Sequence, residues 1–125
     1  MSESVKYLGK QQHEAIDTLD VVSAPAPGVV VKLICSEFTS HCPVTKQPDF
    51  AHLVIEYEAR ESIVETKSLK LWLWRWRGRA DFNEKIVVDI ARAFFTQVQP
   101  AWVTVRGDFN TRGGIAVSPT FTVRA

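Results

Sequence analysis

The chain has 125 residues, of which 46% are hydrophobic and 23% charged, and its formal net charge is +1. This length and composition predict one globular domain and exclude long disordered tracts. The nearly neutral charge argues against a dedicated nucleic-acid-binding module. No apolar run approaches the ~18 residues of a transmembrane helix. The N-terminal sequence MSESVKYLGKQQHE has no apolar signal-peptide core, which predicts a cytoplasmic protein.

The chain begins with a polar segment that is followed by two predicted strands. Residues 1–28 end in SAPAPG and are predicted to be an N-terminal arm, and residues 29–125 are predicted to form the single domain. Apolar and β-branched residues predict strands over Val29–Cys35 and His52–Tyr57. The polar segment Glu37–Pro48 carries two prolines and is predicted to be a loop.

A third strand is predicted over Thr66–Trp76, where leucine and tryptophan alternate. In a strand, the leucines would face one side and the tryptophans the other. The two sets are Leu69, Leu71, Leu73 and Trp72, Trp74, Trp76. A strand that is apolar on both faces must be covered on both faces. We therefore expect part of the tryptophan face to meet another subunit.

The second half of the chain predicts one long helix and two more strands. Apolar side chains at helical spacing predict a helix over Asp81–Gln99, with Asp81 as its N-cap and Glu84 three residues later. Strands are predicted over Trp102–Phe109 and Gly114–Val123, joined by the turn sequence NTRGG. The whole pattern predicts an α+β domain with an antiparallel sheet and little helix.

Cys42 is the candidate nucleophile. It lies in SHCPVTKQPDFA between two prolines, seven residues before Asp49. A thiol becomes nucleophilic when it is partly exposed and close to a base or a positive charge, and the stiff loop would allow the carboxylate to return to the sulfur. The alternative, a structural cysteine beside a turn aspartate, stays open on spacing alone. Cys35, in an apolar strand, is typical of core packing.

Metal binding is a further alternative. The available ligands are Cys35, His41, Cys42 and His52. Zinc sites usually show close CxxC or HxxxH pairs, and this sequence contains neither spacing. No metal site is predicted.

Basic residues follow one another at short intervals in the segment ETKSLKLW. Lys67 and Lys70, with Ser68 and the neighbouring tryptophans, are a candidate site for an anionic, aromatic ligand such as a nucleotide. The cations would bind phosphates and the rings would stack on the base. The alternative is a solvated strand end in which Glu65 forms a salt bridge.

Two other residues have both a functional and a structural interpretation. Arg112, followed by two glycines, is either a second anion site or part of a hairpin turn. Glu84 is either a cap that suits the helix dipole or, if buried, a bidentate acceptor for the N–H edge of a guanine-like base.

Taken together, the segments EFTSHCPVTKQPDFA, VETKSLKLWLWRWR, DFNE and GDFNTRGGI resemble the nitrile reductase family QueF, the 7-cyano-7-deazaguanine reductases of the tunnelling fold. The resemblance runs over roughly Leu33–Pro119, and ETKSLKLW is similar to the signature that separates these reductases from GTP cyclohydrolases. It implies a tunnelling fold, with an antiparallel sheet and helices packed on one face. It also implies NADPH-dependent reduction of 7-cyano-7-deazaguanine to 7-aminomethyl-7-deazaguanine in queuosine-type biosynthesis.

The resemblance implies roles for individual residues. Cys42 would attack the nitrile carbon to form a covalent thioimide, and Asp49 would exchange protons with it. Glu84 would anchor the edge of the deazaguanine, with Asn83 beside it. The NADPH-binding residues would be Glu65, Lys67, Ser68 and Lys70, with Arg112 near the cofactor. Short family members form ring-like homo-oligomers with active sites at the subunit interfaces.

The chain departs from the family at Asn83, where the family usually has histidine. A carboxamide donates hydrogen bonds but does not titrate. An alternative therefore stays open, a QueF-like amidinotransferase in which ammonia attacks the same Cys42 thioimide. The intact ETKSLK segment favours the reductase, because amidine formation needs no NADPH. A catalytically silent base-binding protein is a third possibility, against which the presence of Cys42 and Asp49 argues.

Overall fold

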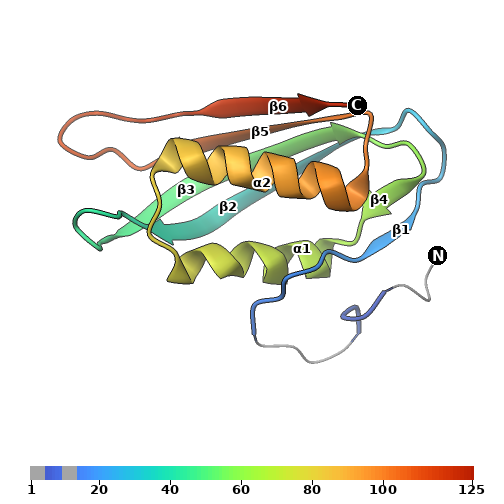
Figure 1. Cartoon of the computed structure of the whole chain (residues 1–125), viewed down its shortest axis with the longest axis horizontal. Helices are drawn as coiled ribbons and strands as arrows, with labels where there is room; N and C mark the ends of the chain where they lie inside the picture. The colour runs from blue at the N-terminus through green and yellow to red at the C-terminus, as the bar shows by residue number, and fades with distance from the viewer. Residues whose placement is uncertain (1–4, 10–13) are drawn as a thin grey trace.

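The computed structural model describes residues 5–9 and 14–125, and a four-stranded antiparallel sheet dominates it (Figure 1). Its strands, in spatial order, are β2 (Val30–His41), β3 (Pro48–Glu58), β5 (Trp102–Phe109) and β6 (Thr120–Arg124). Two helices lie on one face of this sheet. The predicted α+β class with helices on one face of an antiparallel sheet is confirmed.

The predicted N-terminal arm contributes a strand of its own. β1 (Val21–Ser23) pairs with β4 (Ser62–Val64) in a separate two-stranded sheet. Ile16 and Leu19 are buried against the core. Residues 1–4 and 10–13 of the predicted arm lie outside the described residues.

The strand predicted over Thr66–Trp76 is wrong. This segment forms the helix α1 (Thr66–Leu73), followed by the 3₁₀ helix η2 (Trp74–Gly78). The alternation of leucine and tryptophan also contains the helical spacing i, i+3, i+4, i+7. The four side chains on that spacing are all buried: Leu69, Trp72, Leu73 and Trp76.

The expected tryptophan surface is therefore also wrong. Trp72 and Trp76 are at most 1% exposed, and their rings contact each other edge to face, with centroids 5.1 Å apart. Only Trp74 of the three remains half-buried at the surface. The core of this chain covers the two buried rings without a second subunit.

The long helix is confirmed as α2 (Asn83–Val98), but its predicted cap is wrong. The N-cap position belongs to Phe82, which makes no side-chain capping bond. Asp81 accepts a hydrogen bond from Arg79 instead, at 2.8 Å. The helix lies over the sheet because its apolar stripe is fully buried; three members of that stripe are Ile86, Ile90 and Phe94.

Strand boundaries differ from the sequence prediction at two loops. β2 continues to His41, through part of the segment predicted as a loop, because a β-bulge between Cys35 and Phe38 absorbs the irregularity. The last strand begins at Thr120 rather than at Gly114. β5 begins and ends where it was predicted.

Three connections gather at one end of the molecule, on the left in Figure 1. They are the β2–β3 loop (residues 42–47), the η2–α2 link (residues 79–82) and the β5–β6 loop (residues 110–119). We call this region the loop end.

None of the helices in the described residues is both long and apolar enough to cross a membrane.

Candidate active site

Cys42 is held in a tight loop immediately after β2. Its backbone N–H donates to the carbonyl of Gln47 at 2.9 Å, and its own carbonyl accepts from the N–H of Lys46 at 2.9 Å. Lys46 has a positive φ of 63°, which reverses the chain direction there. The loop closes on itself and presents a half-buried thiol.

The loop favours the charged form of this thiol. The Thr45 hydroxyl and the backbone of Thr45 and Val44 hydrogen-bond the sulfur and lower the pKa of Cys42. Partial burial and the negative charge of Asp49 oppose this effect. The net lowering of the pKa increases the thiolate fraction at neutral pH, which is the property of a nucleophilic cysteine.

Asp49 lies opposite the end of β2 and is close enough for its charge to act on Cys42. It is 4% exposed and pairs across the strands with Ser40. Arg112 donates from Nε to Oδ1 of Asp49 at 2.6 Å. Ser40 is fully buried, and its hydroxyl has no hydrogen-bond partner among the described residues. The charge of Asp49 therefore acts on Cys42, which makes Asp49 a candidate proton-transfer partner of that thiol.

Arg112 reaches the same loop from the β5–β6 connection, next to β3. Besides Asp49, it donates from Nη1 to Gln47 Oε1 at 2.9 Å and from Nη2 to the carbonyl of Pro48 at 2.6 Å. The sequence prediction missed the parts of Thr45 and Gln47 in this site. Their position between Cys42 and Asp49 was the only available signal.

The start of α2 lies beside the Cys42 loop. His41 donates its backbone N–H to the carbonyl of Arg79 at 3.1 Å and forms an isolated bridge with Ala80. The candidate residues Asn83 and Glu84 follow in the first turn of α2, half-buried and exposed respectively. Five candidate residues from four elements therefore lie in or next to the loop end: Cys42, Asp49, Asn83, Glu84 and Arg112.

The candidate cofactor segment lies elsewhere, on α1, and two of its residues have a structural role. The Glu65 carboxylate caps α1 by accepting from the backbone N–H groups of Lys67 and Ser68, both at 2.8 Å. The Ser68 hydroxyl donates to the carbonyl of Glu65 at 2.7 Å and accepts from the N–H of Asp20 at 3.0 Å. Both side chains are buried, at 8% and 0% exposure.

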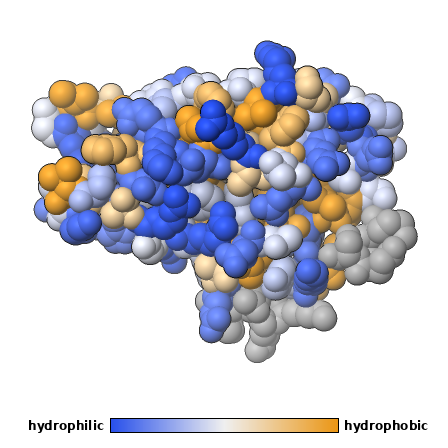
Figure 2. All heavy atoms as spheres, viewed as in Figure 1, coloured by the Kyte–Doolittle hydropathy of each residue, from blue (hydrophilic) through white to orange (hydrophobic). Residues whose placement is uncertain are grey.

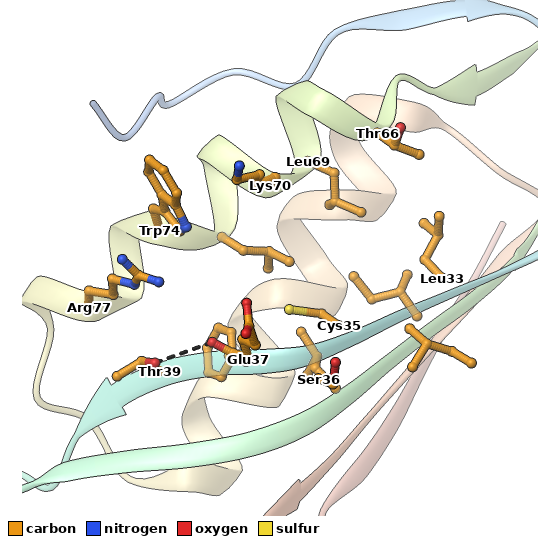
Figure 3. Close-up of a pocket in the computed structure, with 15 residues that line it drawn as sticks. Leu33, Cys35, Ser36, Glu37, Thr39, Thr66, Leu69, Lys70, Trp74 and Arg77 are labelled. Carbon is orange, nitrogen blue, oxygen red and sulfur yellow. Dashed lines mark hydrogen bonds between the residues drawn. The ribbon is translucent and has the colours of Figure 1, made fainter. Parts of the chain in front are cut away.

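A pocket of about 500 Å³ runs between α1 and β2 (Figure 3). Lys70, Trp74 and Arg77 lie along its helical side, opposite Leu33, Cys35 and Thr39 on β2. The Lys70 ammonium and the Arg77 guanidinium lie 5.2 and 5.0 Å from the centre of the Trp74 ring. Lys67 is not among the described residues that line the pocket.

The pocket fits part of a dinucleotide cofactor. Its volume is in the range of small-molecule sites. It offers the cations of Lys70 and Arg77 for phosphates and the Trp74 ring, on which both cations pack. Glu37 adds one carboxylate to the lining. Thr39, at its far end, precedes Cys42 by three residues on β2, so the pocket extends toward the loop end. Within the described residues, no group of three or more histidine, cysteine, aspartate or glutamate side chains is arranged to hold a metal.

A family model described as "QueF-like protein" matches residues 48–124. The chain is 41% identical over 102 residues to the NADPH-dependent 7-cyano-7-deazaguanine reductase of Chelativorans sp., an alignment that covers 82% of this chain and 67% of that protein. The chain belongs to the QueF-like family.

Two other QueF-like relatives carry the same name. The Neisseria gonorrhoeae protein is 48% identical over 89 residues, covering 71% of this chain and 57% of its own length. The Bacillus cytotoxicus protein is 39% identical over 118 residues, covering 94% and 71%. This chain therefore spans between 57% and 71% of the length of these three relatives.

A solved structure confirms the tunnelling fold of this QueF-like chain. The crystal structure of the archaeosine synthase QueF-Like in the apo form superposes with a TM-score of 0.70 at 25% sequence identity, covering 74% of this chain and 91% of that one. The matched family range contains Asp49, Glu65–Lys70, Glu84 and Arg112, and it begins after Cys42.

Proposed function

We propose that this QueF-like chain reduces the nitrile of 7-cyano-7-deazaguanine to 7-aminomethyl-7-deazaguanine with NADPH. The observation that carries the proposal is the loop end itself, where the half-buried Cys42 thiol is within electrostatic reach of the buried Asp49 carboxylate and has a lowered pKa. Relatives named NADPH-dependent 7-cyano-7-deazaguanine reductase, 39–48% identical to this chain, support it.

The first step is addition of Cys42 to the nitrile. The sulfur attacks the nitrile carbon, an S–C bond forms, and one π bond of the C≡N group breaks. Asp49 takes the thiol proton and delivers a proton to the nitrile nitrogen, so the product is a neutral thioimide. Once Asp49 is protonated, its charge no longer opposes the thiolate. Such general acid–base assistance typically contributes ~10²–10⁴-fold.

Reduction of the thioimide requires a cofactor site near Cys42. NADPH supplies, in two successive binding events, the two hydrides that take the nitrile carbon to the amine. Lys70 and Arg77 would hold its phosphates and Trp74 would stack on a ring, because these three residues line the same side of the pocket. Cys42 must leave again as a thiolate when the C–S bond breaks, and the lowered pKa of Cys42 makes it a better leaving group.

The start of α2 is proposed to bind the base. Glu84 is exposed in the single chain, so a neighbouring subunit or the substrate itself would have to cover it. It would then accept from the N–H edge of the deazaguanine, and Asn83 would donate a hydrogen bond to the substrate. Asn83 cannot act as an acid and base in two successive reductions, because a carboxamide does not titrate. Asp49 would therefore carry the proton transfers.

The amidine-forming alternative has less support. The relatives named as reductases are 39–48% identical to this chain, whereas the solved archaeosine synthase QueF-Like is 25% identical. The cationic pocket on α1 also favours a cofactor-dependent reaction, because ammonia addition needs no dinucleotide.

Assembly into a ring-like homo-oligomer is part of the proposal, on a different basis from the one expected from sequence. Large apolar side chains are exposed at the loop end: Val44 by 76%, Phe82 by 64% and Ile115 by 67%. Figure 2 shows hydrophobic residues at that end of the molecule, among others nearer its centre and its opposite end. Exposed apolar side chains beside a candidate site are typical of an interface that completes it. Light scattering that finds a monomer at micromolar concentration would contradict this assembly.

A cytoplasmic location and a role in queuosine-type biosynthesis complete the proposal. Both cysteines are unpaired, as a reducing compartment would keep them. The substrate would be the free base, since the net charge of +1 provides no excess for phosphate backbones.

Product analysis tests the proposed function. The full chain is incubated with 7-cyano-7-deazaguanine and either NADPH or ammonia, and the small-molecule products are weighed by mass spectrometry. We expect a mass gain of four hydrogens with NADPH. A mass gain of one ammonia, independent of NADPH, would contradict the reductase and support the amidine-forming alternative.

A further inference from the structure

The β5–β6 loop is docked onto β3 next to Asp49. The N–H of Asn110 donates to the carbonyl of Phe50 at 2.9 Å, and the side-chain Oδ1 of Asn110 accepts from the N–H of Phe50 at 2.9 Å. One residue therefore satisfies both backbone groups of the residue that follows Asp49. This anchor fixes the start of the loop relative to the carboxylate.

A tight turn then presents Arg112. Its N–H and carbonyl both pair with Ile115, at 3.0 Å each. The two residues between them, Gly113 and Gly114, have positive φ values of 58° and 80°. Positive φ at both central positions is the geometry of a type I′ turn, which glycine adopts without strain. The glycines therefore set the direction in which the Arg112 side chain leaves the hairpin.

The guanidinium makes three hydrogen bonds, all to the strand and loop that carry the nucleophile and its proton partner. They reach Asp49 Oδ1, Gln47 Oε1 and the carbonyl of Pro48. Gln47 also accepts, through its backbone carbonyl, the N–H of Cys42. Arg112 thus connects the carboxylate of Asp49 to the residue that closes the Cys42 loop.

We propose that Arg112 is a positioning residue of the loop end, which holds Asp49 and the Cys42 loop in one fixed arrangement. This inference rests on the proposed function. It differs from a cofactor contact, because the hydrogen bonds of Arg112 are made to Asp49, Gln47 and Pro48 rather than in the pocket beside α1. Arg112 acts through Asp49, whose carboxylate it orients, and through the loop that holds Cys42.

Positioning of this kind affects both halves of the first step. Asp49 transfers a proton only within hydrogen-bond reach of its partner. The contacts that lower the pKa of Cys42 come from Thr45 and Val44, inside the loop that Arg112 ties down at Gln47 and Pro48. If the loop were no longer held in place, Asp49 would be out of position for proton transfer. The thiol would also lose the contacts that lower its pKa.

The test compares three variants of the full chain. Arg112→Ala removes the three hydrogen bonds to Asp49, Gln47 and Pro48. Arg112→Lys keeps the positive charge but loses the planar, forked guanidinium. The matched control is Arg106→Ala on β5, which breaks an exposed ion pair with Asp108 of 3.0 Å. The probes are 7-cyano-7-deazaguanine and NADPH, and kcat and both KM values are measured for reduction.

We expect Arg112→Ala to lower kcat about 10- to 100-fold, because a misplaced catalytic group costs up to about 10²-fold. The KM for NADPH should stay within about twofold of the parent value. Loss of a direct hydrogen bond to the cofactor would raise this KM by more than that. Arg112→Lys should recover part of kcat, and Arg106→Ala should behave like the parent. A raised and more salt-dependent KM for NADPH with unchanged kcat would overturn the inference in favour of a cofactor contact.

Two further readouts separate positioning from general destabilisation. In an Asp49→Asn background, Arg112→Ala should change kcat far less than in the parent, because coupled residues are not additive. Alkylation of Cys42 by iodoacetamide, followed on its peptide by mass spectrometry, should be slower at neutral pH in Arg112→Ala, with its midpoint at higher pH. Equal losses in both backgrounds and an unchanged alkylation profile would overturn the inference.

These outcomes also distinguish the inference from the proposed function. If the parent chain forms no reduced product, the proposed function fails. The alkylation profile still tests the positioning role of Arg112 in that case, because alkylation needs neither substrate nor cofactor. If the parent is active and Arg112→Ala matches it in kcat and alkylation, only the inference fails.

Discussion

The loop end and helix α1 both carry residues of family-like motifs, yet the two regions use those residues differently. At the loop end, residues far apart in the chain converge, and Arg112 bonds Asp49 across 63 positions. On α1, Glu65 and Ser68 bond mainly to their own helix start and to the N-terminal segment. Motif residues therefore bond across distant segments at the loop end, whereas Glu65 and Ser68 stabilise the start of a helix.

Among single substitutions at the loop end and on α1, we expect the largest loss of activity at Asp49. Asp49→Asn keeps the shape of the side chain but removes its ability to accept a proton. We expect formation of the Cys42 thioimide to slow by about 10²–10⁴-fold, the range of general acid–base catalysis. Stopped-flow absorbance with 7-cyano-7-deazaguanine measures the rate. Asp108→Asn, on the exposed side of β5, is the control, and equal rates in both variants would remove Asp49 from proton transfer.

The start of α2 yields the next effect. Asn83→His places a titrating group beside the proposed substrate and should speed NADPH oxidation, by up to about 10²-fold within the general-acid range. The rate of adduct formation should not change. Unchanged or slower reduction would mean that this position does not lack a proton donor, and the amidine-forming alternative would gain support.

On α1, two variants separate ligand contact from helix capping. Lys70→Ala should raise the KM for NADPH roughly tenfold, as expected for loss of one charged contact, and should reduce its salt dependence. Glu65→Ala should leave that KM nearly unchanged and lower the free energy of unfolding by about 1–2 kcal/mol, the usual cost of a lost cap. Urea unfolding and steady-state kinetics measure both. A raised KM in Glu65→Ala at unchanged stability would restore Glu65 to the cofactor site.

The smallest effect concerns Thr45. Its hydroxyl is the largest single cause of the lowered pKa of Cys42. Thr45→Val should raise that pKa, so less thiolate is present at neutral pH and the alkylation profile moves to higher pH. We expect a lower alkylation rate at pH 7, in proportion to the lost thiolate fraction. Thr120→Val on β6 serves as the control, and a profile unchanged in Thr45→Val would assign the low pKa to the backbone contacts.

Elements could be predicted from the sequence where the spacing of apolar residues fits either a helix or a strand, but not both. α2 and β5 have an unambiguous period and were located well. The segment 66–76 was assigned wrongly because Leu69, Trp72, Leu73 and Trp76 satisfy a helical spacing while the leucines and tryptophans also alternate. The cap at Glu65 decides between the two patterns, since two backbone N–H groups bond its carboxylate only when a helix begins there.

For the candidate site, the sequence could group residues that are close in the chain but not residues that the fold brings together. Cys42 and Asp49 could be proposed as a pair from the sequence because they are close in the chain and joined by a loop with two prolines. The contact between Arg112 and Asp49 depends on the pairing of β3 with β5 and on the turn after Arg112, which no local pattern reveals. The buried positions of Glu65 and Ser68 likewise depend on contact with Asp20, 48 residues from Ser68.

The most direct test of the central claim is the mass of the intact protein after incubation with 7-cyano-7-deazaguanine in the absence of NADPH. We expect a gain equal to the full mass of the nitrile substrate in the parent chain and in Cys35→Ala, and no gain in Cys42→Ala. A gain in Cys42→Ala, or none in the parent, would contradict Cys42 as the nucleophile.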